Sequence, residues 1–227
     1  MTAMINTRTW WVYGCALVMA STVLTGCSRM VVGSARLADS AAVPIDALLI
    51  EPARFPAQYP AAVLEGTAVY RALNDIDGVA PGSVVTPSDC APPPTASHRS
   101  VAAEGIDSAT ASSLIVAVTR PAPDLRERAE QLRRCASFTT VQHGVTSEVT
   151  VTMLPEPPVD ADDSFAVDQT VTPQSAGPVR RTLTFAAQIG DTRVSATWLH
   201  QGDPEDPDTA SLHTLFNDAV LKVRRSA

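Results

Sequence analysis

Lysine is almost absent from this 227-residue sequence, since Lys222 is its only copy. The 17 basic residues, nearly all of them Arg, stand against 24 acidic ones, and the formal net charge is −7. Proteins that bind nucleic acid concentrate Lys and Arg on one surface, where the cations neutralise phosphates. The charge balance therefore argues against a nucleic-acid partner.

The sequence also lacks the short motifs of nucleotide-binding and hydrolytic enzymes. It contains no G-x-x-x-x-G-K-[ST] or G-x-G-x-x-G phosphate cradle, and no serine stands in G-x-S-x-G. A hydrolase needs a nucleophile held by a base, and that base oriented by a third group. Such triads assemble from distant residues, so a cell-wall hydrolase stays an alternative. We predict a protein that is not an enzyme and that carries no cofactor.

Long apolar runs are missing beyond residue 24, so no later segment approaches the roughly 20 residues that cross a membrane. The run at the N-terminus, Trp10 to Leu24, has no charged residue and follows a single basic residue, Arg8. This pattern is typical of a secretory signal. An uncleaved transmembrane helix is the alternative, but the run is short and is interrupted by Gly14 and Ser21.

The apolar run ends in Leu24-Thr25-Gly26-Cys27. This tetrapeptide resembles the bacterial lipobox, in which an aliphatic residue, a small residue and Gly or Ala precede a Cys. The resemblance implies that Leu24, Thr25 and Gly26 are the recognition positions, that Cys27 receives diacylglycerol, and that cleavage precedes Cys27. An ordinary secreted Cys just past the signal is the alternative. Two acyl chains anchor a protein far better than one.

Three segments follow from this interpretation. Residues 1–26 are the lipoprotein signal peptide, 27–43 are the lipidated Cys and a flexible tether of small and polar residues, and 44–227 form a single domain. About 200 residues suffice for one hydrophobic core. The predicted location is the extracytoplasmic face of the cell membrane, with the lipid on Cys27 as the membrane attachment.

Cysteine usage supports export. Cys15 leaves with the signal and Cys27 carries the lipid, so Cys90 and Cys135 remain. Exported proteins meet an oxidising compartment in which a Cys pair normally closes. The bridge would close a loop of about 46 residues, worth about 4 kcal/mol in the chain-entropy treatment. Two free thiols are the alternative, and without a C-x-x-C motif zinc binding and redox catalysis are poorly supported.

Helical periodicity occurs twice in the first half of the folded part. Ala61 to Ile76 is predicted to be helical, with Val69, Leu73 and Ile76 at i, i+4 and i+7. A second helix begins at Pro123-Asp124, since proline suits a first turn, and runs to about Arg134. Residues 79–98 are predicted to be a rigid Pro-rich loop, with a ligand for a polyproline-binding domain as the alternative.

Strand patterns dominate the remainder. They cover residues 114–119, then 138–142 and 147–153 around His143-Gly144, then 165–172, and then 181–189 and 192–200 around Gly190-Asp191. A last helix has an apolar stripe that consists of Leu212, Leu215, Phe216, Ala219, Val220 and Val223. Asp206 or Asp208 can cap its start, and Lys222, Arg224 and Arg225 suit its end. The predicted fold class is α+β, a mainly antiparallel sheet with amphipathic helices packed on it and one disulfide.

This order of elements carries a resemblance to a known family. A loop Cys precedes a strand and a helix that ends in Arg133-Arg134-Cys135-Ala136-Ser137-Phe138, followed by antiparallel strands, a hairpin with Trp198 and a terminal amphipathic helix. With the lipobox, the chain resembles mycobacterial cell-envelope lipoproteins akin to the extracellular sensor domain of the protein kinase PknH, over residues 45–225. The resemblance implies a ligand bound in a cleft. The chain has one Cys pair where the kinase domain has two.

Two clusters could contact ions or membranes. His200, Asp203 and His213 are the candidate ligands of a metal, although their spacing fits no calcium loop, and a solvated acidic loop that caps the last helix is the favoured interpretation. The helix with Arg126, Arg128, Arg133 and Arg134 also carries Glu127 and Glu130. It is predicted to be a solvated face, with a contact to acidic glycans or lipid head groups as the alternative.

The leading functional hypothesis is a membrane-anchored, non-catalytic module of the cell envelope that binds a ligand or an envelope protein. The first alternative is a lipid or glycolipid carrier, which needs an apolar cavity of several hundred Å³. Residues 183–198 and 212–223 could line such a cavity, and a packed core would use the same residues. The shape between the sheet and the last helix separates these hypotheses.

Overall fold

The computed structural model describes residues 43–94, 96–202 and 205–226. Within these ranges nine strands form one sheet in the order β1-β3-β4-β9-β8-β7-β6-β5-β2, and every neighbouring pair is antiparallel. No helix in the described ranges is long and apolar enough to cross a membrane. The signal peptide, Cys27, the tether up to residue 42 and Asp203 lie outside the described residues.

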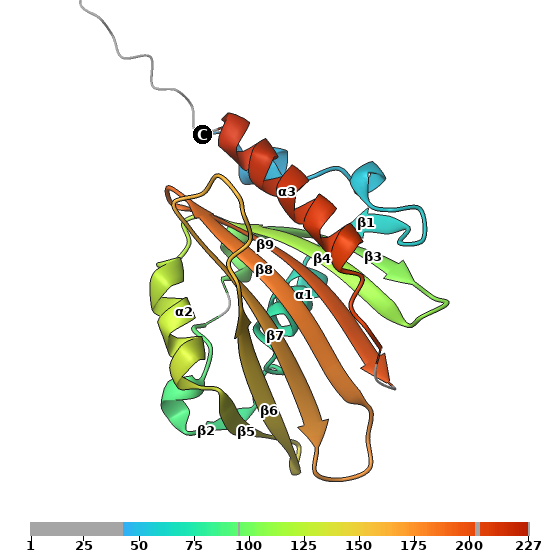
Figure 1. Ribbon diagram of the computed structural model, residues 1–227, viewed down its shortest axis with the longest axis vertical. Coiled ribbons are helices and arrows are strands. Elements are labelled where there is room, and N and C mark those ends of the chain that lie inside the picture. The colour runs from blue at the N-terminus through green and yellow to red at the C-terminus, as the bar shows by residue number, and fades with distance from the viewer. Residues whose placement is uncertain (1–42, 95, 203–204, 227) are drawn as a thin grey trace, which may run out of the picture. The chain divides into compact units, whose positions relative to one another are not determined.

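The strands are β1 (Ala61–Val63), β2 (Val84–Thr86), β3 (Ser100–Asp107), β4 (Ser112–Thr119), β5 (Ser137–Gln142), β6 (Val145–Leu154), β7 (Asp163–Pro173), β8 (Val179–Ile189) and β9 (Thr192–Gly202). The α-helices are α1 (Thr67–Asp77), α2 (Leu125–Arg134) and α3 (Thr209–Ser226). Helix α3 crosses one face of the sheet, and α1 and α2 pack on the other (Figure 1). The predicted α+β class is confirmed.

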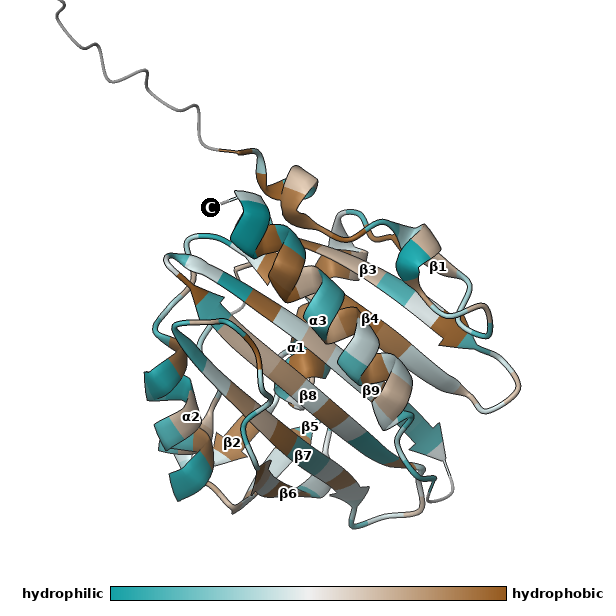
Figure 2. Cartoon of the chain, turned by 45° about the horizontal axis from the view of Figure 1, so that its top comes forward, coloured by the Kyte–Doolittle hydropathy of each residue, from teal (hydrophilic) through white to brown (hydrophobic). Residues whose placement is uncertain are grey.

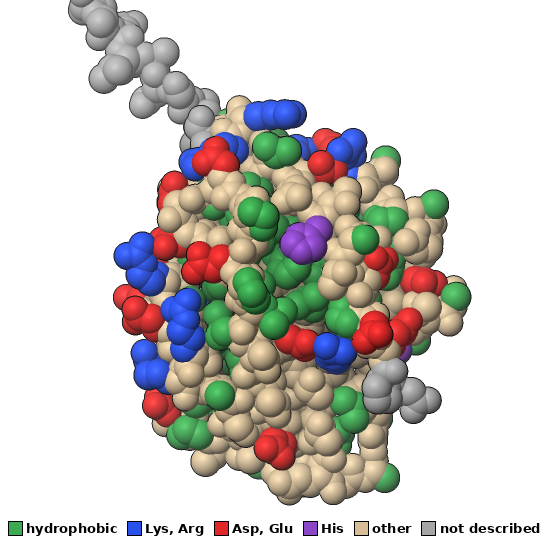
Figure 3. Space-filling view, viewed as in Figure 1, with side chains coloured by type: hydrophobic (Ala, Val, Ile, Leu, Met, Phe, Trp, Pro, Cys, Tyr) green, Lys and Arg blue, Asp and Glu red, His purple; other side chains and the backbone are tan. Residues whose placement is uncertain are grey.

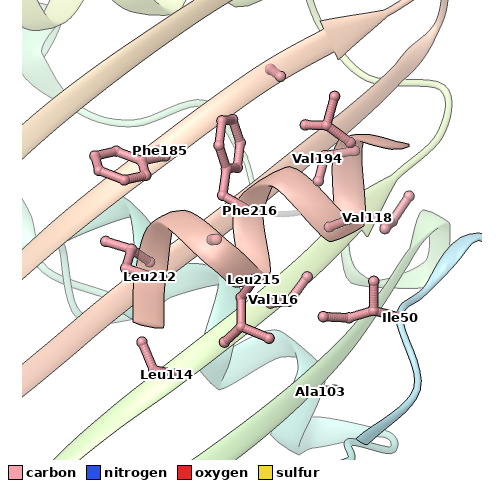
Figure 4. Packing of buried hydrophobic residues seen from close by; sticks show 14 of the residues in the cluster. Ile50, Ala103, Leu114, Val116, Val118, Phe185, Val194, Leu212, Leu215 and Phe216 are labelled. Atoms are coloured by element: carbon pink, nitrogen blue, oxygen red, sulfur yellow. The ribbon is translucent and has the colours of Figure 1, made fainter. Parts of the chain in front are cut away.

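We call the side of the sheet under α3 the α3 face. Alternate residues of β4, β8 and β9 point to it and meet the apolar stripe of α3 in one cluster, because successive side chains of a strand point to opposite faces. Leu212, Leu215 and Phe216 have no exposed surface, and Trp198 beneath them is 1 % exposed. Figure 4 shows Leu212, Leu215 and Phe216 directed from α3 toward the strands, and Figure 2 shows apolar residues interspersed with polar ones along β8 and β9.

We call the opposite side the polar face. Its apolar contacts form two separate clusters, one under α1 around Val69 and Ile115 and one under α2 around Leu132 and Val149. The central strands between the two helices carry polar side chains instead, namely Gln169, Thr182, Thr184, Arg193, Ser195 and Thr197. A region of polar side chains on the sheet therefore separates the apolar contacts of α1 from those of α2.

The predicted disulfide is confirmed. Cys90 and Cys135 are bonded, with their Cα atoms 5.6 Å apart and both residues buried. Cys135 follows the last residue of α2, so the bond ties the end of that helix to the Pro-rich loop. Gln131 strengthens the same junction, because its side-chain amide donates to the carbonyl oxygens of Asp89 and Ala91 at 2.7 Å each.

The predicted helix ends are largely confirmed. Helix α1 ends before Gly78, which adopts a left-handed conformation with φ +74°, and α2 begins after Asp124, whose carboxylate accepts from the backbone N–H of Arg126. At α3, the backbone N–H of Ser211 donates to Oδ1 of Asp208 at 3.1 Å, so Asp208 rather than Asp206 makes the cap that the structure records. The stripe on α3 is buried at all six predicted positions.

The prediction was wrong at one edge of the sheet. Residues 61–63, predicted as the start of a helix, form the edge strand β1, which pairs with β3, and the helix begins only at Thr67 after Gly66 with φ +53°. The strand β3 was not predicted. The Pro-rich segment 79–98 is also more than a loop, because it contains β2, which pairs with β5.

Candidate functional site

The space between the sheet and α3 is filled. The residues that could have lined a carrier cavity, on the 183–198 hairpin and the 212–223 stripe, pack against one another as the largest core cluster. The ring of Phe185 meets that of Phe216 edge-on at 5.6 Å and that of His213 at 4.5 Å. The described residues form hollows on the polar face, and one of about 420 Å³ at the surface where α3 meets the segment with Ile50, Glu51 and Arg54.

One of these hollows, which we call the strand-end cleft, has a volume of about 410 Å³. It lies where the last turn of α1 approaches the ends of β5 to β9. It is lined by Asp75, Gly78, Ala80, Ser83, Thr140, Gln142, His143, Val145, Ser147, Val171, Pro173, Pro178, Arg180, Leu199 and Gln201. Cross-strand pairing sets Val171 beside Arg180 and Arg180 beside Gln201, so adjacent strands present their side chains in one row.

The charged residues of the cleft neutralise each other. Arg180 Nη1 lies 3.0 Å from Asp75 Oδ1, and its Nη2 donates to the carbonyl oxygen of Gly78 at 2.9 Å. Burial raises the pKa of Asp75 and lowers that of Arg180, and each charge opposes the shift of the other. This pair joins the end of α1 to β8 and leaves the cleft without net charge from these two residues.

The other polar groups of the cleft are hydroxyls and amides. Ser83, Thr140, Ser147 and Gln201 each offer both donor and acceptor capacity. Gln142 is already engaged, because its Nε2 donates to the carbonyl oxygen of Pro81 at 2.9 Å. The cleft is thus suited chemically to a polar molecule that both donates and accepts hydrogen bonds.

A second group of polar residues lies nearer the centre of the polar face. Asp77, at the end of α1, accepts from Arg128 Nη2 of α2 at 3.3 Å, and Arg193 of β9 also interacts with it. Burial raises the pKa of Asp77, and Arg128 and Arg193 act against that rise. A cavity of about 280 Å³ beside α2 is lined by both arginines.

The prediction of a solvated basic face on α2 was wrong for Arg128. Arg133 and Arg134 are exposed, and Arg126 pairs with Asp163 at 2.8 Å at the surface. Figure 3 shows acidic and basic side chains mixed along this edge of the molecule. Arg128, however, is only 8 % exposed, because it points inward between α1 and α2.

The candidate metal ligands do not form a cluster in the part of the chain that the structure describes. His200 Nδ1 lies 3.2 Å from Oε2 of Glu205, and its ring stacks on Trp198 at 5.8 Å. His213 packs on Phe185 instead, and Asp203 lies outside the described residues. Among those residues, no three His, Cys, Asp or Glu side chains are grouped to hold a metal ion.

His200 has a hydroxyl neighbour as well as a carboxylate. Ser112 is its direct partner in the pairing of β4 with β9. Both residues are buried, at 2 % and 7 % exposure, and Ser112 Oγ shares a 2.6 Å hydrogen bond with the hydroxyl of Thr110. A hydrolytic nucleophile must be reachable by its substrate, so this cluster serves better as support for the strand ends than as a catalytic triad.

Neither Arg180 nor the pairing of Asp77 with Arg128 was predicted from the sequence. Their partners are far apart in the chain, since Arg180 lies 105 residues from Asp75 and Arg128 lies 51 residues from Asp77. Ionic pairs of this kind leave no local pattern. The acidic Asn-Asp-Ile-Asp end of α1, which supplies Asp75 and Asp77, was the available signal.

No protein-family model and no curated protein matches the chain. Two solved mycobacterial structures are similar to it. A Mycobacterium smegmatis protein described as an Rv0999 ortholog shares 15 % identity, over 73 % of this chain and 86 % of that one, with a TM-score of 0.42. The extracellular domain of PknH from Mycobacterium tuberculosis shares 14 % identity, over 77 % and 98 %, with a TM-score of 0.44. The second of these structures is the extracellular domain to which the sequence bears a resemblance.

Proposed function

We propose that this chain is a lipid-anchored, extracytoplasmic and non-catalytic binding module whose strand-end cleft takes a neutral polar ligand. The observation that carries the proposal is the cleft itself. Its volume of about 410 Å³ falls within the roughly 300–1,000 Å³ of small-molecule sites. The opposite side of the sheet is filled by the core under α3.

The chemistry of the cleft favours a ligand rich in hydroxyl and amide groups, such as a cell-wall sugar. Such a ligand offers donors and acceptors to Ser83, Ser147 and Gln201. A strongly anionic ligand would need a cation free to pair with it. Arg180 is already neutralised by Asp75 at 3.0 Å, so an anion is the poorer match here.

Binding of a sugar in the cleft is tested by titrating isotope-labelled protein with oligomers of N-acetylglucosamine and following the amide chemical shifts by NMR. Binding should move the signals of β6 and β9 around Ser147 and Gln201, while the signals of α3 stay in place. Ser147→Trp fills the cleft and should abolish the shifts. Thr150→Trp adds the same bulk to an exposed position of β6 that points to the other face, and it should bind like the parent.

Two results would contradict the proposed ligand class. One is the absence of any shift at millimolar oligosaccharide, and the other is an equal loss of binding in both tryptophan variants. Mass spectrometry of the oligosaccharide after incubation tests the non-catalytic part of the proposal. Cleaved or modified sugar would overturn that part alone.

The anchor rests on the lipobox, Leu24-Thr25-Gly26-Cys27. Incorporation of labelled fatty acid in an actinobacterial host should mark the parent protein and be lost in Cys27→Ala. The variant should also leave the membrane fraction. Labelling that persists without Cys27 would place the lipid elsewhere.

A further inference from the structure

Three hollows of the polar face have Arg193 as a common lining residue. The largest, which we call the α2 cavity, has a volume of about 280 Å³ and is lined by Asp89, Ala91, Pro93, Pro123, Asp124, Glu127, Arg128, Gln131, Arg134 and Arg193. Two smaller hollows of about 40 and 70 Å³ lie deeper, and Arg193 lines both. Arg193 therefore lies between the sheet and the surface.

Positive charge exceeds negative charge among the residues that line the two deeper hollows. Arg128 and Arg193 both face Asp77, which is the one carboxylate among the described residues that line the two deeper hollows. Within the two deeper hollows, two guanidinium groups against one carboxylate leave one formal positive charge, and the exposed Asp124 outside them is a second carboxylate that acts on Arg193. Arg128 is 8 % exposed, and Arg193 is sufficiently covered that burial lowers its pKa. Charges held away from water need partners, so this excess calls for an anion.

Arg193 also has an unused donor. Its Nη2 donates to the carbonyl oxygen of Pro123 at 2.6 Å. Its Nε is buried and has no hydrogen-bond acceptor among the described residues. Leaving a buried donor unpaired is unfavourable, and a charged donor more so. An oxygen supplied by a ligand would satisfy it.

We propose that the α2 cavity binds a tetrahedral oxyanion, such as a phosphate group, between the guanidinium groups of Arg193 and Arg128. The planar fork of Arg matches the oxygens of phosphate in geometry as well as in charge. The carboxylates at the rim, Asp89, Asp124 and Glu127, are exposed, where water and salt screen their repulsion. Asp124 is moreover engaged with the backbone N–H of Arg126 at 2.8 Å.

This site is separate from the strand-end cleft, because the two share no lining residue. The disulfide between Cys90 and Cys135 ties the Pro-rich segment, whose Asp89, Ala91 and Pro93 line the α2 cavity, to the end of α2. Failure of either proposal therefore leaves the other standing.

The test is a calorimetric titration of the disulfide-intact protein with inorganic phosphate, in a buffer kept at constant ionic strength with chloride. Heat of binding at one site is expected. Arg193→Gln should weaken phosphate binding about tenfold or more, since it removes a charge-assisted hydrogen bond. Arg133→Gln removes the same charge from an exposed position of α2 outside the cavity and should leave the affinity unchanged.

Two further variants keep the proposal testable if Arg193→Gln does not fold. Arg193→Lys keeps the charge but loses the planar fork, so it should bind phosphate more weakly than the parent. Asp77→Asn removes the competing carboxylate, so it should bind phosphate more tightly. A purely structural role of the cluster predicts no gain in affinity from that change.

A parallel titration with glycerol 1-phosphate distinguishes a free anion from a phosphate carried on a larger molecule. Similar affinities support free phosphate, and tighter binding of glycerol phosphate supports a phosphorylated glycan or lipid head group. The proposal is overturned if phosphate gives no more heat than chloride. It is equally overturned if Arg133→Gln loses as much affinity as Arg193→Gln.

Discussion

The two faces of the sheet are built on opposite principles. The α3 face is joined to its helix by apolar packing, with Leu212, Leu215 and Phe216 fully buried. The polar face holds α1 and α2 with smaller apolar clusters, the ion pairs of Asp75 and Asp77, and a disulfide. The apolar packing leaves no room for a ligand between α3 and the sheet, whereas the polar face has clefts lined by hydrogen-bonding groups. The largest apolar core thus lies on one side of the sheet, and the two proposed binding sites lie on the other.

The largest effect is expected on the α3 face. Phe216→Ala should lower the free energy of unfolding by about 3–5 kcal/mol, because it removes a fully buried ring and leaves a cavity. Leu221→Ala, on the same helix but 46 % exposed, should change it by less than about 0.5 kcal/mol. Urea unfolding followed by tryptophan fluorescence measures both. A small loss for Phe216→Ala would mean that α3 is not the structural anchor of the domain.

A smaller and more local effect is expected from the disulfide. Replacing both Cys90 and Cys135 with Ser should lower the free energy of unfolding by about 2–4 kcal/mol. Amide hydrogen exchange should then accelerate in α2 and in residues 79–94, while α3 stays protected. Equal acceleration in α3 would show that the two faces unfold as one unit.

Removing single polar groups from the polar face should lower the free energy of unfolding less than removing the disulfide does. The effects of two such changes should not add. The hydroxyls of Thr184 and Thr197 are buried and lie 2.8 Å apart on paired strands. Thr184→Val alone should lower the free energy of unfolding by about 1–2 kcal/mol, because it leaves the other hydroxyl unpaired. The double change to Val should be close to neutral, since it removes both partners. Equal and additive losses would show that the hydroxyls act independently.

The contrast between the faces also explains how much the sequence could predict. The stripe of α3 and the 181–200 hairpin were predicted correctly because an apolar face buried against a core imposes its period on the sequence. The strand β3 was not predicted, because its sequence is Ser-Val-Ala-Ala-Glu-Gly-Ile-Asp and contains few large apolar residues. Ala102 and Ala103 are nevertheless fully buried, since neighbouring elements pack closely on that strand.

Close packing also accounts for the glycine in β3. A Cβ atom at Gly105 would lie 2.7 Å from the carbonyl oxygen of Tyr59, so a larger residue would separate the segment before β1 from β3.

The ion pairs of the polar face left even less local signal in the sequence. Asp77 and Arg128 are 51 positions apart in the chain, and Asp75 and Arg180 are 105 apart. These contacts therefore depend on the final placement of α1 over the sheet. The sequence could show that the charges exist, but their partners depend on the tertiary fold.

The smallest expected effect lies at the border of the polar face, at Glu104 of β3. Burial raises the pKa of Glu104 and Asp75 adds to the rise, while the hydroxyl of Ser113 and the charge of Arg71 oppose it. A carboxyl whose pKa is raised on folding stabilises the fold when protonated, and that contribution is lost as the pH rises through the folded-state pKa. At pH 7 the ionised group therefore works against folding.

Glu104→Gln should accordingly raise the Tm at pH 7, because the amide fills the same space without a charge that must be desolvated. The gain should shrink as the pH falls through the raised pKa toward the ordinary Glu value of about 4.3, since the parent then becomes neutral as well. Glu127→Gln removes an exposed carboxylate of α2 and controls for the change in net charge. A gain in Tm at Glu104 that persists unchanged at pH 4 would trace the effect to packing. The stability of the polar face would then depend on how well the side chains pack rather than on buried charge.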